Sequence, residues 1–531
     1  MPVTVNILDE PLFPVRWSSD ADEHDGGGRP ARVGLLNLLL RAHEIEGLAV
    51  PDAPAHSALL RILYALTARM TGLDEAKNGP DDWQLLRDEV LAEGRLPEKG
   101  IERYFARYRE RFFLFDFQPG GRPWMQDPRL KDQCDASSTA GVNKLLATRP
   151  AGNNHSWFRH ASDARPDLST VSDAVLNLLT WHYYGPSGRC SAREVGGVKS
   201  ASAKAGPLRT SLSYHPEGDT LFETLLAGLV PPPREVDAEH DQCPWEWDEL
   251  PDPDGPPPAL NGPCSRLTAS SMHALLLVPE ESGDKVRDAY ITWAYRTGRG
   301  ARPDDDYLIW QISKQGNTYP RPADSSRALW RDLDALLLID PPGLAQPRRP
   351  KVFEWALEVS PELRVRALGF EQEGKGAKDI QFVDAVTPPV LGFLEKRSAR
   401  TQPAVGRLRA VGERFGNRLD RALHRAWRTY VNDPKDSADA WAQEGAARYW
   451  PAAEREFWDR FALLDRTGTA LDGGLNAAAA RTSFLRLAVR AFDEVTASAA
   501  RTQRGAKAVE EARIELFGDR RGKPARPDAA A

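Results

Sequence analysis

Apolar residues recur at helical spacing early in the chain. Residues 35–48 and 58–70 repeat them every three or four positions with few polar residues between, which predicts two helices buried on more than one side. Ahead of these helices, residues 6–16 alternate apolar and polar side chains. Pro11 and Pro14 restrict that stretch to a short edge strand, because proline has no N–H to donate to a neighbouring strand.

Shorter apolar runs dominate the middle of the chain. Between residues 271 and 340, runs such as 274–278, 290–295 and 307–312 are separated by charged or Gly-rich turns, a pattern typical of antiparallel strands. Helical and strand patterns therefore both occur over residues 1–390. We expect this part to form a mixed α/β domain.

After Pro388 and Pro389 the pattern is helical almost to the end. It predicts helices over residues 407–431, 438–464, 477–500 and 502–517, and four antiparallel helices would form a bundle. The expected fold class is therefore α+β. It comprises the mixed α/β domain, a C-terminal four-helix bundle over residues 391–520 and a disordered tail over residues 521–531.

An acidic, proline-rich stretch interrupts the mixed domain at residues 231–263. It holds ten prolines and nine Asp or Glu residues. Proline favours extended backbone and like charges repel each other, so we expect a solvated connector that runs over the surface.

Size and charge limit the possible functions. With 531 residues the chain exceeds what one hydrophobic core normally organises, so at least two domains are expected. Its formal net charge is -6, which argues against a protein that coats nucleic acid through clustered Lys and Arg. Any contact with nucleic acid should therefore be local.

Other sequence features concern compartment and redox state. No apolar run approaches the ~18 residues that span a bilayer, and the N-terminus lacks a signal-peptide pattern, so we expect a cytoplasmic protein without membrane contact. The four cysteines are too few and too scattered for a disulfide framework or a C-x-x-C zinc site, so they should be reduced thiols. They are Cys134, Cys190, Cys243 and Cys264.

The segment 152–160 reads Gly-Asn-Asn-His-Ser-Trp-Phe-Arg-His and favours neither a long helix nor a regular strand. Asn154 could hydrogen-bond to base edges, and Arg159 could reach a phosphate or a base. Trp157 and Phe158 could stack on bases or wedge between them. Adjacent aromatics more often anchor a loop to the core, because they bury a large apolar area. From these residues alone both interpretations stay open.

A basic stripe lies on the first predicted bundle helix. Its arginines are spaced alternately by four and three residues, which puts them on one helix face beside an apolar stripe. Such a stripe is more often a solvated face or a set of ion pairs than a nucleic-acid site. A polyanion or an acidic partner would also fit. The stripe consists of Arg414, Arg418, Arg421, Arg425 and Arg428.

The sequence carries no recognisable catalytic motif, phosphate-binding loop or nucleophile elbow. We therefore expect a protein that is not an enzyme and needs no cofactor. One catalytic alternative remains, a metal-dependent nuclease or phosphohydrolase built on the doublets His24-Asp25 and His240-Asp241. Both doublets lie in acidic, Gly- or Pro-rich stretches, where solvated charge is the more common explanation. A purely structural scaffold is a second alternative.

Several segments, in their order along the chain, resemble the CasA family, the large subunits of type I-E CRISPR Cascade complexes. None of them is a catalytic signature, and the resemblance rests on their number and order over essentially the full length. They are residues 6–16, 38–48, 122–126, 244–246, 262–268 and 328–332, followed by the terminal helices.

The resemblance implies a subunit that makes no covalent bonds. It would recognise the short motif beside a foreign double-stranded DNA target, start duplex opening and recruit a helicase-nuclease. Its partners would be the other Cascade subunits with their guide RNA. Sequence reading would then be left to guide pairing, as in other RNA-guided effectors, which is compatible with a negative net charge.

The resemblance also implies site residues. A glycine loop that contacts the minor groove maps to residues 194–200, with Gly196, Gly197 and Lys199. A lysine that reaches the same groove maps to Lys285, and a hairpin wedge that splits the first base pairs maps to residues 369–376. Within the wedge we expect Gln372 at the tip, with Lys375 as the alternative.

The two remaining elements also gain roles from the resemblance. The loop bearing Asn154, Trp157 and Phe158 would contact the motif region or dock the subunit onto the complex. The bundle would lie beside the small subunits and the displaced strand, where its arginines suit sequence-tolerant binding of single-stranded DNA.

Overall fold

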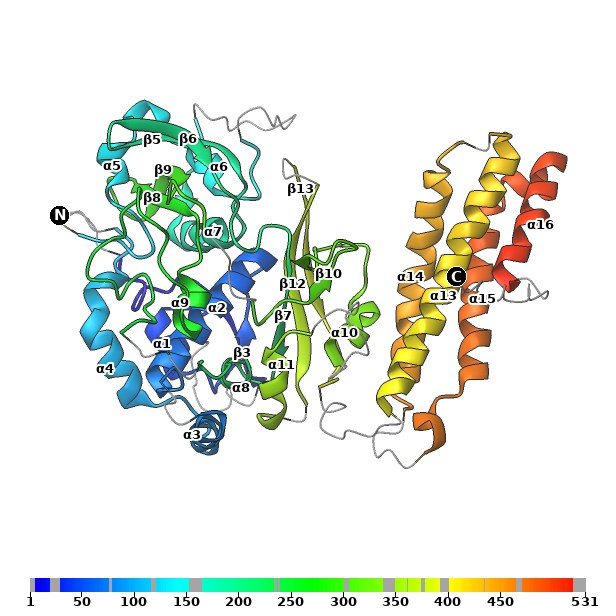
Figure 1. The fold of residues 1–531 in the computed structure, drawn as a ribbon, viewed down its shortest axis with the longest axis horizontal. Coiled ribbons are helices and arrows are strands. Elements are labelled where there is room, and N and C mark those ends of the chain that lie inside the picture. Colours follow the sequence, from blue (N-terminus) through cyan, green and yellow to red (C-terminus); the bar gives the residue numbers. More distant parts are fainter. Residues whose placement is uncertain are drawn as a thin grey trace, which may run out of the picture. The chain divides into compact units, whose positions relative to one another are not determined.

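The computed structural model (Figure 1) describes residues 5–19, 29–75, 79–115, 121–151, 165–233, 236, 239–299, 305–337, 349–360, 362–373, 378–391, 401–433, 435–464 and 470–518. The chain divides into two compact units. Unit 1 comprises Met1–Ser325 and Pro341–Gly392, and unit 2 comprises Ser326–Asp340 and Phe393–Ala531. Ser326–Asp340 therefore belongs with the C-terminal helices, although the sequence pattern placed it in the mixed domain.

Unit 1 contains all the described strands and most of the short helices. The strands are β1 (Phe13–Trp17), β2 (Arg32–Val33), β3 (Ile45–Leu48), β4 (Ser169–Thr170), β5 (Gly188–Val195), β6 (Val198–Ala203), β7 (Leu212–Glu217), β8 (His273–Pro279), β9 (Lys285–Trp293), β10 (Trp310–Ile312), β11 (Thr318–Pro320), β12 (Arg364–Glu373) and β13 (Lys378–Val386). The helices are α1 (Leu35–Leu40), α2 (Ala53–Thr71), α3 (Pro80–Ala92), α4 (Glu98–Tyr108), α5 (Leu130–Gln133), α6 (Val142–Leu145), α7 (Val171–Tyr184), α8 (Leu221–Ala227), α9 (Pro263–Thr268) and α11 (Val352–Trp355).

Helix α2 is the central helix of unit 1 and confirms the helix predicted over residues 58–70. It packs against α7, α8, α9 and β12, and nearly all of its residues are buried. Arg61 carries a charge into this core. Its guanidinium forms an ion pair with Asp305 (Nη1–Oδ2 2.7 Å) and donates to Ser213 Oγ (3.0 Å), so the buried charge is paired and hydrogen-bonded.

The predictions for the first fifty residues are partly wrong. The helix expected over residues 35–48 ends at Leu40, and strand β3 follows. Strand β1 is not an edge strand, because the sheet order is β2-β1-β3. Pro14 has no N–H to donate to a neighbouring strand, but β2 is only 2 residues long, so few strand hydrogen bonds are lost. The Pro14 carbonyl still accepts a hydrogen bond from Ala49 N (2.9 Å).

The other strands of unit 1 form hairpins and small sheets. The runs 274–278 and 290–295 correspond to the antiparallel strands β8 and β9, and the run 307–312 contains the shorter β10. The hairpin β5–β6 lies beside β9 (Figure 1). Strands β13, β12 and β7 form an antiparallel sheet in that order.

Unit 2 contains the predicted four-helix bundle. Its long helices are α13 (Thr401–Val431), α14 (Asp439–Phe461), α15 (Ala477–Thr496) and α16 (Gln503–Phe517), preceded by the short α10 (Leu333–Leu337). Trp330, which is fully buried, stacks on Phe457 with ring centroids 4.8 Å apart. Gly412 on α13 leaves room for the Trp330 ring. This packing explains why the segment 326–337 belongs to the bundle, and the predicted α+β class is confirmed.

The acidic, proline-rich segment 231–263 was predicted to be a solvated connector. The structure shows instead that part of it is buried. Cys243, Trp245 and Glu246 are buried. The Asp241 carboxylate accepts hydrogen bonds from three backbone N–H groups at the start of α9, including Cys264 N (2.9 Å) and Ser265 N (2.7 Å). Its charge is balanced by these donors, so it can be buried at a helix N-terminus. The prediction failed because it treated every acidic residue as solvated.

Two further observations complete the fold. All four cysteines are free thiols. Within the described ranges, none of the helices combines the length and the apolar character needed to cross a membrane.

Candidate nucleic-acid interface

The hairpin β5–β6 presents the two glycines singled out in the sequence. Val195 pairs with Val198, so Gly196 and Gly197 form a two-residue turn, and both have positive φ (58° and 74°). Such turns favour glycine because other residues are strained there. A Cβ added to Gly197 would meet no atom of the described chain within 4 Å. The backbone of this turn is therefore open to close approach by another molecule.

Arg296 lies behind this turn and was missed in the sequence. Its Nη2 donates to the carbonyls of Val195 (3.1 Å) and Val198 (3.3 Å), one on each side of the glycines. Its guanidinium also stacks on Trp293, at 4.8 Å from the ring centroid. An arginine just after a strand carries no motif signal, so only the packing of the hairpin against β9 reveals it.

Lys285 does not lie beside the glycine turn, which corrects the prediction. It begins β9, where it pairs with Thr170 of β4. The hairpin β5–β6 contacts the other end of β9, where Trp293 Nε1 donates to Ser200 O (3.1 Å). The two ends of β9 are eight residue steps apart, or about 27 Å at ~3.4 Å per step. Arg296, and not Lys285, is therefore the cation that lies behind the turn.

Lys199 lies on β6 next to the turn, as predicted. It is exposed and forms an ion pair with Asp135 (Nζ–Oδ2 2.6 Å). The hydrogen bond from this lysine to Asp135 raises the pKa of Lys199. Exposed pairs of this kind are weak, so a phosphate could compete for the lysine.

A buried ion pair anchors strand β5 close to the glycine turn, where Arg193 pairs with Ser200 of β6. Arg193 of β5 is fully buried and donates to Asp127 Oδ2 (2.8 Å) and to Trp293 O (3.0 Å). Burial opposes the charge on Asp127, but the hydrogen bonds from Arg129 and the charge of Arg193 outweigh it and lower the pKa of Asp127. The hairpin is thus joined to β9 and to the segment that precedes α5.

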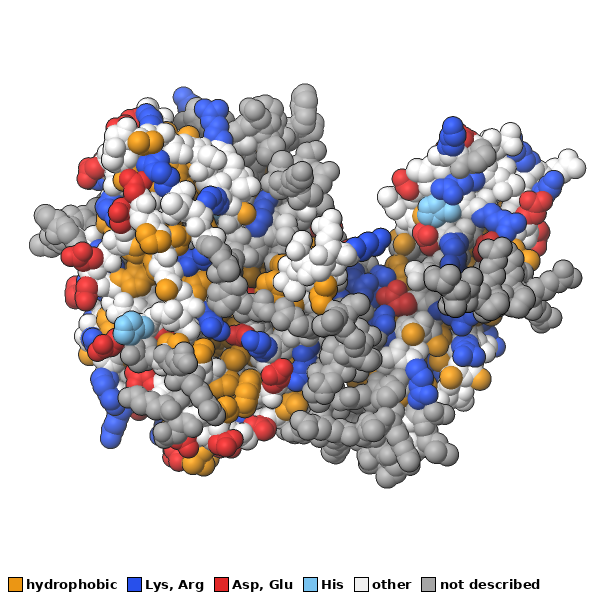
Figure 2. Space-filling model, in the orientation of Figure 1, with side chains coloured by type: hydrophobic (Ala, Val, Ile, Leu, Met, Phe, Trp, Pro, Cys, Tyr) orange, Lys and Arg blue, Asp and Glu red, His pale blue; other side chains and the backbone are white. Residues whose placement is uncertain are grey.

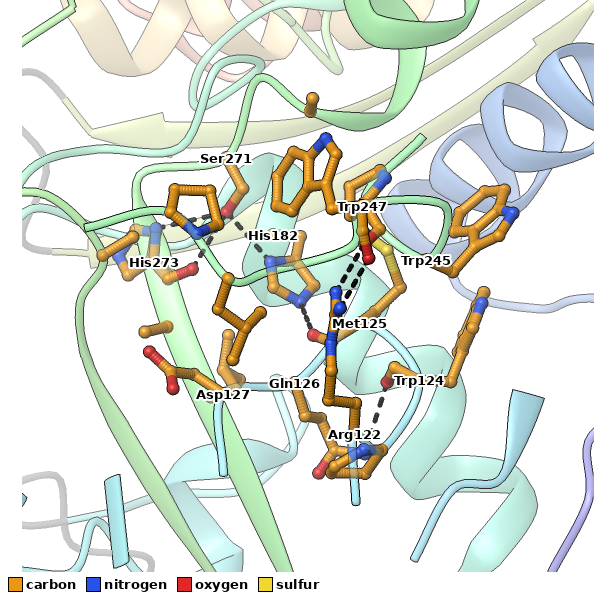
Figure 3. A pocket seen from close by; sticks show the side chains of 18 of the residues that line it. Arg122, Trp124, Met125, Gln126, Asp127, His182, Trp245, Trp247, Ser271 and His273 are labelled. Atoms are coloured by element: carbon orange, nitrogen blue, oxygen red, sulfur yellow. Dashed lines mark hydrogen bonds between the residues drawn. The ribbon is translucent and has the colours of Figure 1, made fainter. Parts of the chain in front are cut away.

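A pocket of about 90 Å³ lies between residues 122–126 and 244–246 (Figure 3). Both segments are among those that resemble the CasA family. Arg122 donates to the backbone carbonyls of Trp247 and Asp248 (2.9 Å to the latter). Arg129 Nη1 donates to Pro251 O (3.0 Å). Arg122 and Arg129 therefore hold the backbone of the acidic, proline-rich segment beside the pocket.

A buried histidine also lines this pocket. Figure 3 shows His182 between Ser271 and Met125, with Nδ1 2.9 Å from Ser271 Oγ and Nε2 2.7 Å from Met125 O. The carbonyl can only accept, so Nε2 carries the proton. Burial lowers the pKa of His182 to about 4, so the imidazole is neutral at physiological pH. The histidine therefore joins α7 to both neighbouring segments.

The structure corrects the expected position of Gln372. It lies in strand β12, where it pairs with Asp379 of β13, and only 9% of its surface is exposed. It is therefore not at the tip of the hairpin. The residues between the two strands, 374–377, include Lys375 and lie outside the described residues. Within the described part of this hairpin, Phe370 packs edge-to-face on its cross-strand partner Phe382, with ring centroids 5.0 Å apart.

The loop residues Asn154, Trp157, Phe158 and Arg159 also lie outside the described residues. Their predicted contacts therefore remain predictions.

The arginine stripe on α13 divides into two kinds of residue. Arg418 donates to Leu516 O (3.2 Å) and Arg425 pairs with Glu515 (2.8 Å), both on α16. Burial, followed by the charges of Arg414 and Arg421, lowers the pKa of Arg418. Arg414 and Arg421 are exposed and make no hydrogen bond or ion pair with any described residue. Figure 2 shows blue Lys and Arg side chains recurring on the visible face of the bundle, with red Asp and Glu among them.

The metal-enzyme alternative gains no support from the geometry. Asp241 already accepts three backbone hydrogen bonds, so its carboxylate is committed to capping α9. Over the ranges that the structure describes, no three His, Cys, Asp or Glu side chains are grouped to hold a metal ion. The doublet His24-Asp25 lies outside those ranges.

Solved structures place this fold among CRISPR-associated proteins. A chain in a structure described as "CRISPR RNA-guided surveillance complex" is 38% identical, with a TM-score of 0.84, over 97% of this chain and 100% of that one. A structure of Thermus thermophilus CasA (Cse1) shares the fold at 22% identity, with a TM-score of 0.73, over 97% of this chain and 98% of that one.

Sequence comparison specifies the family. The model of the family described as CRISPR-associated protein Cse1 matches residues 6–494, so the chain belongs to that family and the resemblance is confirmed. A curated relative from Thermus thermophilus, CRISPR-associated protein CasA/Cse1, is 29% identical over 341 residues. That match spans 62% of this chain and 60% of the relative, less than two thirds of its length.

Proposed function

We propose that this chain is the subunit of an RNA-guided surveillance complex that recognises the short motif beside a double-stranded DNA target. The main support is the glycine turn of β5–β6 with Arg296 fixed behind it. The 38% identical chain in the solved surveillance complex supports the assembly with guide RNA and other subunits. The chain would contribute binding and no catalysis.

The turn is suited to a narrow groove. The minor groove is ~6 Å wide, so a turn without side chains can approach base edges that a bulkier residue could not reach. Arg296 would add a cation that is already oriented, and Lys199 would reach a nearby phosphate. A few such local contacts suffice, because guide pairing reads the rest of the target. This explains how a chain with a net charge of -6 can bind DNA.

Duplex opening would follow at the β12–β13 hairpin. Inserting a wedge costs a few kcal/mol of unstacking per base step, offset by groove contacts and later guide pairing. Since Gln372 lies within the strand, Lys375 becomes the better candidate for the inserted residue. The displaced strand would then meet the arginines of α13, and a helicase-nuclease would be recruited for degradation.

The proposal is tested by comparing guide-RNA complexes that contain this chain with complexes that lack it. A guide-RNA complex is reconstituted with and without the chain, and its affinity is measured by gel shift on duplexes with an intact or scrambled flanking motif. The proposal predicts that the chain confers a preference for the intact motif. A scaffold would instead be needed for assembly without any preference, and a metal-dependent nuclease would cleave DNA only with a divalent cation and lose that activity in His240→Ala.

A further inference from the structure

A donor and an acceptor lie side by side at the glycine turn. Asp254 Oδ1 accepts a hydrogen bond from Arg296 Nε (2.6 Å), and Asp254 Oδ2 lies 3.1 Å from where a Cβ of Gly196 would be. Arg296 Nη2 is occupied by the two hairpin carbonyls, whereas Nη1 donates to no residue in the described part of the chain. The side chains of Arg296 and Asp254 are 30% and 38% exposed, so both can be reached.

Both groups are held by backbone contacts from the proline-rich segment. Arg296 N donates to Pro253 O (2.9 Å), and Thr297 Oγ1 donates to Gly255 O (3.1 Å). Asp254 N donates to the carboxylate of Asp252 (3.0 Å). The pair therefore needs little ordering when a ligand binds, so more of its hydrogen-bond energy can appear as affinity.

The minor-groove edges of base pairs differ in one group that such a pair could detect. An A·T pair presents only acceptors there, whereas a G·C pair adds the N2 amino donor of guanine. A carboxylate oxygen repels an edge made of acceptors and accepts from the guanine amino group. The neighbouring Nη1 donors suit the acceptors of the same pair. Arg296 also balances the charge of Asp254, which reduces repulsion from the DNA phosphates.

We propose that Asp254, with Arg296, reads the N2 amino group of a guanine in the flanking motif, so that the complex prefers a G·C pair at the glycine turn. This inference rests on the proposed function and specifies which base-pair edge the turn selects. The inference also assigns a function to the acidic, proline-rich segment, because this segment places Asp254 beside the hairpin.

The experiment uses base analogues that change only the minor groove. Each guanine of the flanking motif is replaced in turn by inosine, which lacks the N2 amino group, and gel-shift affinities are measured with the reconstituted complex. We expect one inosine position to weaken binding about tenfold, or ~1.4 kcal/mol, because the hydrogen bond from the guanine amino group is lost. Replacing adenine by 2,6-diaminopurine in an A·T variant of that position should restore most of the loss.

Asp254→Ala should bind guanine and inosine duplexes equally. Asp248→Ala removes an exposed carboxylate from the same segment and should retain the tenfold difference. If no inosine position affects the wild-type complex, the inference is overturned, even if Asp254→Ala fails to fold. If no inosine position matters but the chain still confers a motif preference, the proposed function stands and only the guanine contact of Asp254 is wrong. If omitting the chain leaves the motif preference unchanged, the proposed function itself is wrong.

Discussion

The chain carries its candidate DNA-binding cations in two regions that hold them very differently. Arg296 is fixed by Asp254, by the carbonyls of Val195 and Val198 and by stacking on Trp293. Arg414 and Arg421 on α13 are exposed side chains without such restraints among the described residues. A fixed guanidinium can test the geometry of a base edge, whereas a loose one settles on any phosphate within reach.

This difference assigns discrimination to the hairpin and sequence-independent affinity to the bundle. The hairpin can discriminate because buried contacts hold it close to the turn, above all the Arg193–Asp127 pair. The affinity that the bundle contributes should fall as the salt concentration rises, because each phosphate contact releases counterions. Variants in the two regions should therefore change different observables.

The largest effect is expected for Gly197→Asp. A side chain at φ 74° is strained, and a carboxylate at the turn would project toward the DNA. We expect the preference for the intact motif over a scrambled one to fall about a hundredfold, or roughly 3 kcal/mol, in gel-shift titrations. Gly94→Asp is the matched control, since Gly94 has a similar φ (68°) and nothing within 4 Å of its Cβ position. An equal loss in Gly94→Asp would show that the effect comes from folding.

Arg296→Ala should have the next largest effect. It removes the cation behind the turn and the hydrogen bonds to both hairpin carbonyls. We therefore expect the motif preference to fall about ten- to thirtyfold, which corresponds to roughly 1.4–2 kcal/mol. Arg296→Lys should recover only part of this loss, because lysine lacks the planar fork that serves two carbonyls and a carboxylate together. Lys285→Ala, at the far end of β9, should leave the preference unchanged. A larger effect at Lys285 than at Arg296 would reverse the assignment.

A smaller and different effect is expected for the double variant Arg414→Ala/Arg421→Ala. Affinity should fall severalfold for intact and scrambled motifs alike. The magnitude of the slope of log affinity against log salt should decrease by about 1.4, because each of the two lost contacts to single-stranded phosphates contributes ~0.7. Arg481→Ala/Arg486→Ala on α15 removes the same charge from other exposed positions of the bundle. If both double variants lower the slope equally, net charge rather than the α13 stripe is responsible.

The smallest effect on DNA binding should come from His182, which affects mainly the stability of unit 1. Its pKa is about 4 in the folded protein and about 6.5 when unfolded, so the unfolded chain takes up the proton first. Stability is therefore lost as the pH falls below 6.5, by about 2 kcal/mol at pH 5. Burial raises the pKa of Asp74 and Asp306 to about 6, which opposes this trend.

Urea unfolding of the wild type and His182→Gln at pH 7 and pH 5 isolates the histidine, because the two aspartates contribute equally to both proteins. The variant should lose about 2 kcal/mol less than the wild type over this pH range. Equal losses in both proteins would mean that His182 is not held neutral in the folded state.

Local patterns predicted much of the fold. The bundle helices and α2 follow from apolar spacing, which depends only on neighbours along the helix. The short strand β3 was missed because its pairing with β1 is set by residues far away in the sequence. The burial of Asp241 and Glu246 was missed for the same reason, since their partners lie on α9 and at Arg69 of α2.

The candidate site was only partly predictable. Gly196 and Gly197 were selected by resemblance, and their place in the turn agrees with the local requirement for glycine at positive φ. Arg296 and Asp254 were missed because they reach the turn from two other segments. Lys285 was selected by resemblance, but the direction of β9 takes it away from the turn. Sequence therefore predicted the turn but not the side chains that support it.

The central claim is that the hairpin discriminates the motif and the bundle does not. The most direct measurement is the ratio of affinities for intact and scrambled motifs, determined with complexes that carry Arg296→Ala or Arg414→Ala/Arg421→Ala over a range of salt concentrations. The account predicts that Arg296→Ala reduces the ratio at every salt concentration, while the bundle variant lowers both affinities and preserves the ratio. A ratio that is reduced by the bundle variant and unchanged by Arg296→Ala would contradict it.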